Sequence, residues 1–381
     1  MKYYIIAGEA SGDLHASNLM ASISELDREA EFRCWGGDRM QARGGVLVRH
    51  YRDLDYMGFV EVLQNIRSIL RLISLCKKDL LACRPDVLIL IDYPGFNLRM
   101  SKFASKHGIR TVYYISPQVW AWQQSRVKTI RRYVDKMLVI LPFEQEFYKK
   151  LGVNVTFTGH PLLDAIDSGN ALTDPETFRK QHNLPDKPLV AILPGSRQLE
   201  IRNMLPVMAA AARNFPAHHF VIAGLSTHPK SVYESAADIS GTSLLFGQTY
   251  SLLRHSAAAM VTSGTATMET ALLGVPQVVC YNVSAITYFM ARRVAKVSYI
   301  SLVNLIMDKP VVRELIQHHL TAKTLALEME KLLFDNAYRQ QIHLGYQELR
   351  MKLGGGGASK RAARAILNEI TGEKDEQEPP T

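Results

Sequence analysis

The segment VTSGTATMETALLGVP, Val261 to Pro276, joins a β-branched start to a run of small residues and then to a helical pattern. We expect a strand that ends at Thr262, a tight turn over Ser263–Thr265 and a helix over Ala266–Leu273. A buried strand followed by a turn and a helix is the repeating unit of parallel, doubly wound sheets. This stretch therefore predicts the fold class, which is α/β.

The turn in this segment has the composition of an anion site. The backbone N–H groups of a helix's first turn have no partner within the helix, so they attract anions. Gly264 lets a phosphate approach closely, and Ser263 and Thr265 add hydroxyl donors. Glu269, one helical turn later, is suited to accept hydrogen bonds from a ribose diol. The pattern fits a nucleoside diphosphate, and it fits an N-capped helix with a solvated Glu269 about equally well.

The remainder of the chain repeats this strand character in two groups. A length of 381 residues exceeds the roughly 250–300 residues that a single core usually reaches, so we expect two domains. The predicted strands are Tyr3–Ala7, Val87–Ile91, Thr111–Ile115 and Met137–Leu141 in the first group, and Leu189–Leu193, His219–Ala223, Ala258–Thr262 and Gln277–Tyr281 in the second.

Turn-forming residues between Gly159 and Pro188 indicate where the domains meet. We assign residues 1–165 to an N-terminal domain and 166–353 to a C-terminal domain. The glycines Gly354 to Gly357 precede a last helix, 354–370, which is free to cross back onto the first domain. An acidic, proline-bearing tail, 371–381, is expected to be disordered.

Composition narrows the class of protein without choosing a partner. Hydrophobic residues make up 47% of the chain and charged residues 21%, which is typical of a packed globular protein. The four cysteines lack a paired spacing, so we expect reduced thiols in a cytosolic protein. A net charge of +9 suits nucleic acid, a nucleotide or a membrane surface. The sequence has neither a signal-peptide pattern nor a stretch of about 20 apolar residues that would span a bilayer.

A second turn of the anion-ready type is LPGSR, which follows the strand Leu189–Leu193. Gly195 and Ser196 form the turn, and the forked guanidinium of Arg197 matches a phosphate. A surface arginine in an ordinary loop is the alternative. Two such turns in one domain support a phosphate site more strongly than either turn alone.

Two motifs in the first half follow predicted strands. AGEASGD, residues 7–13, lacks the spacing of a dinucleotide fingerprint and the lysine of a P-loop. Its polar residues Glu9, Ser11 and Asp13 suit sugar hydroxyls instead. IDYPGFN begins at the end of the strand Val87–Ile91, at the sheet edge where ligands bind in open α/β folds. Asp92 is therefore a candidate general base, and capping of the next helix is the alternative.

Two segments have the character of a membrane-binding surface. Residues 59–78, FVEVLQNIRSILRLISLCKK, form one apolar helical stripe, yet Leu72 and Leu75 fall among the polar residues and Arg67 and Arg71 line one edge. This pattern fits a helix at a bilayer interface, or a core helix with a few exposed leucines. The segment 116–136 interleaves Trp120 and Trp122 with five basic residues including Arg126, which fits nucleic acid, an anionic lipid headgroup or a solvated helix face.

Eight motifs occur in an order that resembles a known family: AGEASGDLH, MGFVEVL, IDYPGFN, SPQVWAW, TGHPLLD, LPGSR, SGTATMETAL and SLVNLI. Together they resemble lipid-A-disaccharide synthase, a glycosyltransferase of bacterial lipid A assembly. The resemblance extends from Tyr3 to about Leu367. Each motif is weak by itself, and the ordered set is highly specific.

The resemblance implies a GT-B architecture, with two Rossmann-like domains facing a cleft. It implies that UDP-2,3-diacylglucosamine and 2,3-diacylglucosamine 1-phosphate condense, with inversion, to the β-1,6-linked disaccharide 1-phosphate and UDP. It also implies no metal and no cofactor, no nucleic acid, a peripheral position on the cytoplasmic face of the inner membrane, and a possible homodimer with exchanged C-terminal segments. The family's functional residues fall on Glu9, Asp92 as the candidate base, Arg197, Glu269 and Asn304.

Other functions remain open from the residues alone. Another GT-B enzyme that uses a UDP-sugar, such as the peptidoglycan N-acetylglucosaminyltransferase or a UDP-N-acetylglucosamine 2-epimerase, would share the phosphate-binding turns. A nucleotide-binding, membrane-associated regulatory protein without turnover belongs to a different class. Release of UDP only when a lipid acceptor is added would separate the three.

Overall fold

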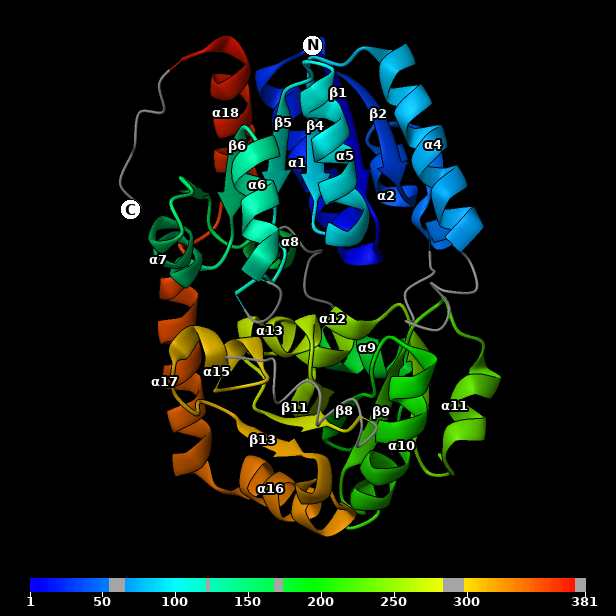
Figure 1. Ribbon diagram of the computed structural model, residues 1–381. Coiled ribbons are helices and arrows are strands. Elements are labelled where there is room, and N and C mark those ends of the chain that lie inside the picture. Colours follow the sequence, from blue (N-terminus) through cyan, green and yellow to red (C-terminus); the bar gives the residue numbers. More distant parts are fainter. Residues whose placement is uncertain (55–65, 121–123, 168–173, 284–297, 374–381) are drawn as a thin grey trace. The chain divides into compact units, whose positions relative to one another are not determined.

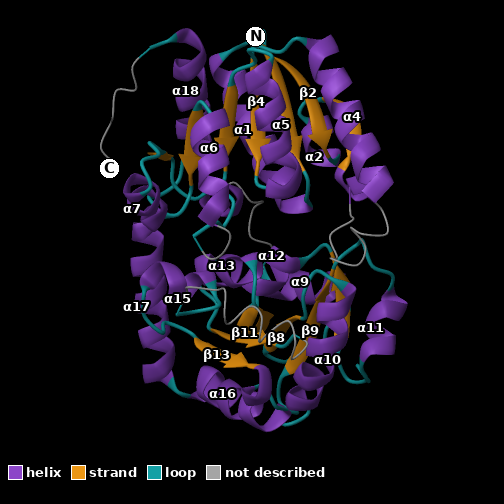
Figure 2. Cartoon of the chain, in the orientation of Figure 1, coloured by secondary structure: helices purple, strands orange, loops and turns teal. Residues whose placement is uncertain are grey.

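The computed structural model describes residues 1–54, 66–120, 124–167, 174–283 and 298–373, and it divides the chain into two compact units (Figure 1). Unit 1 comprises residues 1–168 and 353–381, and unit 2 comprises residues 169–352. Each unit has strands at its centre and helices around them (Figure 2).

Unit 1 contains a parallel sheet of seven strands in the order β3-β2-β1-β4-β5-β6-β7. In this sheet Ala7 at the end of β1 pairs with Ile91 at the end of β4. Its strands are β1 (Lys2–Ala7), β2 (Glu31–Gly36), β3 (Val46–His50), β4 (Val87–Ile91), β5 (Thr111–Tyr114), β6 (Lys136–Val139) and β7 (Thr156–Phe157).

The helices of unit 1 follow its strands in the alternation that parallel pairing requires. They are α1 (Ala10–Leu26), α2 (Asp38–Ala42), α4 (Ile66–Cys83), α5 (Pro94–Lys106), α6 (Val127–Tyr133), α7 (Pro142–Lys150), α8 (Pro161–Asp167) and α18 (Ala358–Thr371). One apolar core cluster joins strand residues such as Tyr4, Leu90 and Tyr113 to buried residues of α4 and α5.

The last helix, α18, belongs to unit 1 although unit 2 precedes it in the chain. It packs against α1 and α8. The carboxylate of Asp164 on α8 accepts hydrogen bonds from the first backbone N–H groups of α18, at 2.6 Å from Gly357, 3.2 Å from Ala358 and 2.7 Å from Ser359. A carboxylate at a helix N-terminus satisfies N–H groups that the helix leaves unpaired, and it meets the positive end of the helix dipole.

Unit 2 repeats the topology with six parallel strands in the order β10-β9-β8-β11-β12-β13. Its strands are β8 (Leu189–Leu193), β9 (His219–Gly224), β10 (Ser243–Phe246), β11 (Ser256–Thr262), β12 (Gln277–Tyr281) and β13 (Arg313–Ile316). Its helices are α9 (Pro175–Gln181), α10 (Gln198–Ala212), α11 (Lys230–Ala236), α12 (Thr249–Arg254), α13 (Thr265–Leu272), α15 (Leu302–Met307), α16 (Ala322–Phe334) and α17 (Asn336–Lys352).

The predicted α/β class with two doubly wound, Rossmann-like sheets is confirmed, and each of the eight predicted strands is present. Five further strands were not predicted: β2, β3, β7, β10 and β13. Four of these are the edges of the two sheets, where one side of the strand is open. Within the described ranges, the helices lack the combination of length and apolar content that crossing a membrane requires.

Candidate functional site

The candidate residues cluster at equivalent places in the two sheets. In each sheet the strand order reverses between two neighbouring strands, β1 and β4 in unit 1 and β8 and β11 in unit 2. Ligands of doubly wound folds bind beyond the carboxyl ends of the strands at this switch point. The four predicted loops, which begin at Gly8, Asp92, Pro194 and Ser263, follow these four strands directly.

The loop after β4 has an unusual backbone. Asp92 has φ +43° and Tyr93 has φ +47°, which is the left-handed region that residues with a side chain seldom adopt. The ring of Tyr93 lies against Gly8, so that a Cβ on Gly8 would come within 2.3 Å of the ring. The glycine of the first loop is therefore required for the second loop to lie beside it. Non-glycine residues in this conformation often mark functional sites.

The carboxyl group of Asp92 is suited to proton transfer. The pKa of Asp92 is raised to about 7, chiefly by burial and then by the negative charge of Glu9. A general base works best when its pKa lies near the working pH. The arrangement therefore supplies a base that is partly ionised at neutral pH, from a residue type whose ordinary pKa is near 4.

Of the three polar residues that the sequence predicted to bind a sugar in the first loop, two are accessible and one is buried. Glu9 precedes α1 and is exposed, and Ser11 in the first turn is half-buried. Asp13, however, is buried, and its carboxylate accepts hydrogen bonds from the backbone N–H groups of Gly37 at 2.8 Å, Arg39 at 3.1 Å and Met40 at 3.1 Å. The expected contact of Asp13 with a sugar is therefore wrong: its carboxylate holds the loop between β2 and α2.

The segment that interleaves aromatic and basic residues does not form a stacking surface in its described part. Trp120 is buried, and its indole N–H donates to Glu144 Oε1 at 3.2 Å. Glu144 also accepts from the backbone N–H of Leu141 at 3.0 Å, and burial raises its pKa to about 7. Trp122 lies outside the described residues. The basic residues Arg131 and Arg132 are exposed on α6, as expected for a solvated helix face.

The loop after β11 has the geometry of an open helix N-terminus. Gly264 precedes α13 with φ +157°. Among the described residues, no side chain caps the helix there, and no atom lies within 4 Å of the place where a Cβ would stand. Thr265 is exposed, and Ser263 Oγ donates to the carbonyl oxygen of Ile300 at 3.3 Å. Thr262, the last residue of β11, is buried, and its hydroxyl has no hydrogen-bond partner among the described residues.

Glu269 lies one turn further into α13 and is partly buried. Its Oε1 accepts a hydrogen bond from the hydroxyl of Tyr250 at 2.7 Å, a contact that the sequence did not reveal. Burial raises the pKa of Glu269. The tyrosine therefore fixes one carboxylate oxygen of Glu269.

The loop after β8 differs from this open arrangement. The carboxylate of Glu200 on α10 accepts from the backbone N–H groups of Ser196 at 2.9 Å and Arg197 at 3.2 Å. Gly195 has φ +117°, and a Cβ on it would come within 2.5 Å of Glu200. The two amides that we expected to face a phosphate are therefore occupied by a side chain of the protein. The guanidinium of Arg197 stays exposed at the start of α10.

Asn304 is buried in α15, and its amide is satisfied by the protein. Its Nδ2 donates to the carbonyl oxygen of Val312 at 2.8 Å and to Glu314 Oε1 at 2.9 Å, and its Oδ1 accepts from the N–H of Val312 at 2.9 Å. Glu314 also accepts from the N–H of Ile300 at 3.0 Å. Asn304 and Glu314 together hold the segment whose Ile300 carbonyl receives the hydroxyl of Ser263.

The predicted membrane helix is described only from Ile66, where α4 begins. Residues 59–65 and the side chain of Arg67 lie outside the described residues. Leu72 was expected to face outward, and this is wrong, because it packs against the core cluster of unit 1. Leu70 was expected in the buried stripe and is 59% exposed. Leu75 and Arg71 are exposed as predicted.

A groove lies between α4 and α5. It has a volume of about 520 Å³ and is lined by Ile69, Leu70, Ile73 and Phe103 together with the cations Lys77, Arg99, Lys102 and Lys106. The ammonium group of Lys77 lies 5.1 Å from the centre of the Phe103 ring. The groove combines an apolar lining with cations from both helices.

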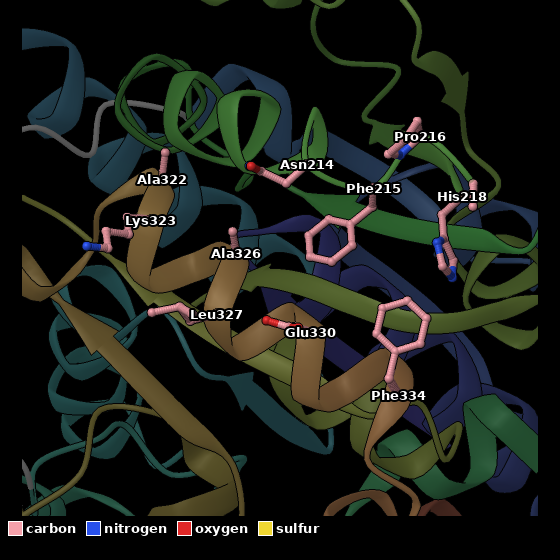
Figure 3. A pocket seen from close by; sticks show the side chains of 11 residues that line it. Asn214, Phe215, Pro216, His218, Ala322, Lys323, Ala326, Leu327, Glu330 and Phe334 are labelled. Atoms are coloured by element: carbon pink, nitrogen blue, oxygen red, sulfur yellow. The ribbon is translucent and has the colours of Figure 1, made fainter.

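A second hollow of about 650 Å³ lies in unit 2 between α16 and the connection from α10 to β9 (Figure 3). Phe215, His218 and Phe334 approach one another there. This connection leads into the amino end of β9, at the edge of the sheet opposite the candidate loops. The hollow is therefore separate from the switch-point site.

Solved structures with the same two-domain fold include nucleotide-sugar enzymes. A UDP-N-acetylglucosamine 2-epimerase from Neisseria meningitidis, bound to UDP-N-acetylglucosamine, matches 97% of this chain and 100% of its own with a TM-score of 0.68 and 14% identity. The calicheamicin glycosyltransferase CalG4 matches 97% of this chain and 98% of its own with a TM-score of 0.62 and 16% identity. At these identities the likeness concerns the fold, which is the Rossmann-like pair of GT-B proteins.

Sequence relatives are more specific. A lipid-A-disaccharide synthase from Syntrophus aciditrophicus is 41% identical over 373 residues, which cover 96% of this chain and 97% of the relative. One from Myxococcus xanthus is 39% identical over 370 residues, covering 95% and 96%. The sequence model of the lipid-A-disaccharide synthetase family matches residues 3–368. The chain therefore belongs to the lipid-A-disaccharide synthetase family.

Proposed function

We propose that the two units divide the reaction of this family between them. Unit 1 holds the lipid acceptor beside a carboxylate base, and unit 2 binds the uridine diphosphate part of the donor. The reaction condenses UDP-2,3-diacylglucosamine with 2,3-diacylglucosamine 1-phosphate to the disaccharide 1-phosphate of lipid A and releases UDP. The donor diphosphate then lies at the switch point of β8 and β11, and the acceptor hydroxyl at that of β1 and β4.

On the donor side, the open N-terminus of α13 and the guanidinium of Arg197 receive the diphosphate. An uncapped helix start offers backbone donors and a partial positive charge, worth about 0.3–1 kcal/mol when exposed and up to about 2 when partly buried. The absence of a side-chain cap at Gly264 supports this assignment. The ribose hydroxyls bind to the carboxylate of Glu269, which Tyr250 holds in place.

On the acceptor side, Asp92 removes the proton from the attacking hydroxyl. The new bond forms between this oxygen and the anomeric carbon, while the bond from that carbon to the diphosphate oxygen breaks and UDP leaves with the electron pair. A single in-line displacement inverts the anomeric centre. Arg197 and the start of α13 stabilise the charge that develops on the leaving diphosphate. Glu9, across the switch point from Asp92, contacts the acceptor sugar.

One observation carries the assignment of the base. Asp92 combines a strained backbone with a carboxyl group whose pKa is raised to about 7, at the position in the fold where ligands bind. In this scheme Asn304 and Ser263 act by position: they hold the backbone around the start of α13 and do not touch the substrate. The occupied amides of Ser196 and Arg197 give the phosphate-binding role in this loop to the arginine side chain.

The test measures UDP release from UDP-2,3-diacylglucosamine with and without the monosaccharide acceptor. We expect release that depends on the acceptor and a fall in kcat of about 10²–10⁴-fold in Asp92→Asn. Asp186→Asn is the control, because Asp186 lies on the surface of unit 2. Turnover of UDP-N-acetylglucosamine alone would indicate an epimerase. Full activity of Asp92→Asn would remove the base from this scheme.

A second comparison tests the donor site. Arg197→Ala should lower turnover much more than Thr265→Ala, because a full charge on a flexible side chain stabilises the leaving diphosphate more than one hydroxyl or one helix end does. The reverse order in steady-state rates would contradict the roles that we give to these residues.

We also propose a peripheral position on an anionic membrane, at the cytoplasmic face of the inner membrane. Both substrates carry acyl chains, so the enzyme needs apolar surface where they enter. Exposed Leu70 and Leu75 on α4, with the groove whose cations include Lys77 and Lys102, support membrane contact through this helix. The glycine-rich link to α18 supports exchange of this helix in a homodimer, which light scattering of the protein in solution would test.

A further inference from the structure

Two side chains from different elements donate to one backbone carbonyl at the candidate base. The hydroxyl of Tyr113 on β5 lies 2.5 Å from the carbonyl oxygen of Asp92, and Asn97 Nδ2 on α5 lies 2.8 Å from the same oxygen. Asn97 Nδ2 also donates to the carbonyl oxygen of Ile91 at 3.1 Å. Tyr113 and Asn97 are completely buried. The reaction scheme above uses neither side chain.

These bonds fix both peptide groups that flank Asp92. Asn97 holds the peptide before it through the Ile91 carbonyl, and the Asp92 N–H donates to the carbonyl oxygen of Tyr114 at 3.4 Å. Tyr113 and Asn97 hold the peptide after it. With both peptide planes fixed, the direction of the Cα–Cβ bond of Asp92 is fixed as well. This matters because φ is +43° here, a conformation that persists only when its surroundings hold it.

We propose that Tyr113 and Asn97 are positioning residues, which hold Asp92 in its left-handed conformation so that its carboxylate meets the acceptor hydroxyl. The inference rests on the proposed role of Asp92 as the base. Positions of catalytic groups matter at the scale of about 1 Å, where a displacement can cost about 10²-fold in rate. The two residues are therefore expected to control kcat without touching the substrate.

Burial and the ionisable groups around Tyr113 and Asn97, the pair that we call the clamp, keep the Tyr113 hydroxyl protonated. Burial raises the pKa of Tyr113 well above its usual value, and the charge of Asp92 acts in the same direction, so the tyrosine keeps its proton and stays a donor. Glu9 from the loop after β1 interacts with Asp92, and Arg126 at the start of α6 interacts with Tyr113. The carboxyl group of Asp92 therefore loses its proton in surroundings that include the anion Glu9 and the neutral Tyr113.

The test compares two adjacent tyrosines. Tyr113→Phe removes the bond to Asp92. Tyr114→Phe is the control, because neighbouring residues of a strand point to opposite faces, and the Tyr114 hydroxyl interacts with Ser359 of α18 and not with Asp92. We expect Tyr113→Phe to lower kcat at least about tenfold while the KM for the UDP-sugar stays within about twofold. Tyr114→Phe should keep kcat within about twofold.

A pH profile separates positioning from a general loss of structure. If the clamp is released, Asp92 becomes more solvated, and the midpoint of the rise of kcat/KM with pH moves to lower pH in Tyr113→Phe. A structural defect alone would lower the amplitude at every pH and leave the midpoint in place, and that result would overturn the proposal.

Asn97→Leu supplies a second variant of similar size that cannot donate to either carbonyl and places no charge beside Asp92. It should show the same fall in kcat and the same shift of the midpoint, measured on protein whose fold is verified by its thermal transition. Wild-type kcat and midpoint in both Tyr113→Phe and Asn97→Leu, with Asp92→Asn inactive, would refute the clamp and leave the base intact. An active Asp92→Asn would instead refute the base itself.

Discussion

The pH dependence of the reaction gives a direct test of the environment of Asp92. The pKa of this carboxyl is raised from 3.8 to about 7 by burial and then by Glu9. With a midpoint at pH 7, about 9% of the enzyme carries an ionised base at pH 6 and about 91% at pH 8, so kcat/KM should rise about tenfold between these values. The perturbation is Glu9→Gln, which removes the repelling charge and keeps the size of the side chain.

The expected shift follows from the order of the two causes. Burial is the larger cause and remains in the variant, so the midpoint should fall only part of the way toward the ordinary value. A like charge near a protein surface contributes roughly 1–2 kcal/mol before screening by salt, which corresponds to a shift of about one pH unit or less. The midpoint in Glu9→Gln should therefore lie about half a unit to one unit below that of the wild type.

The assay is the initial rate of UDP release at low substrate concentration, from pH 5 to pH 9. The acceptor phosphate itself titrates near pH 6, and this affects both enzymes equally. The difference between their midpoints therefore belongs to the protein. A wild-type profile that is flat from pH 6 to pH 8, or a midpoint that moves upward in Glu9→Gln, would refute the environment that we assign to Asp92.

Three other predictions concern stability and membrane binding. Because the pKa of Asp92 is raised in the folded state, the free energy of unfolding of the wild type falls as pH rises from about 4 to 7. Relative to the wild type, Asp92→Asn should therefore gain up to about 1.4 kcal/mol of stability per pH unit in that window and no more above it. Urea unfolding at pH 5 and pH 8 would show this difference. Leu70→Ser should release protein from anionic vesicles without lowering the melting temperature, because Leu70 is exposed. Leu72→Ser should lose roughly 1–3 kcal/mol of stability, because Leu72 packs against the core cluster of unit 1. Equal co-sedimentation of Leu70→Ser and the wild type with vesicles would contradict the membrane role. Asp164→Ala should lower the free energy of unfolding by about 1–2 kcal/mol and speed amide hydrogen exchange in residues 358–371, because three N–H groups lose their acceptor. Unchanged exchange in these residues would show that the carboxylate does not hold α18.

The sequence predicted eight of the strands inside the two sheets, because each of these is a short run of buried, mostly apolar residues; it missed β2, which also lies inside the sheet of unit 1. Val87–Ile91, Leu189–Leu193 and Gln277–Tyr281 have the predicted bounds. The edge strands escaped because they are half-exposed and mix polar with apolar residues, as in RELI of β13. The four candidate loops could be located because glycine, serine and acidic residues follow central strands, which is a local pattern.

The partners of these loops were not found, because they are distant in the sequence or depend on side-chain direction. Asp13 was assigned to a sugar, but the N–H groups that donate to its carboxylate lie more than twenty residues away, at Gly37 and in the first turn of α2. Glu200 was not recognised as a cap, although an acidic residue three positions after Arg197 is a known signal of this kind. The clamp of Tyr113 and Asn97 depends on the pairing of β4 with β5, which a single segment does not reveal.

The placement of α18 in unit 1 has a consequence for how the protein is made. Residues 169–352, which form unit 2, leave the ribosome before α18 does. At about 5–20 residues per second, the surface of α1 that α18 covers stays open for about 10–40 s while unit 2 is synthesised, and unit 2 is complete about 1–4 s before the end of α18 is made. The later-made half can therefore mature first, and the nascent earlier half carries an apolar face that a chaperone is suited to shield until the closing helix emerges.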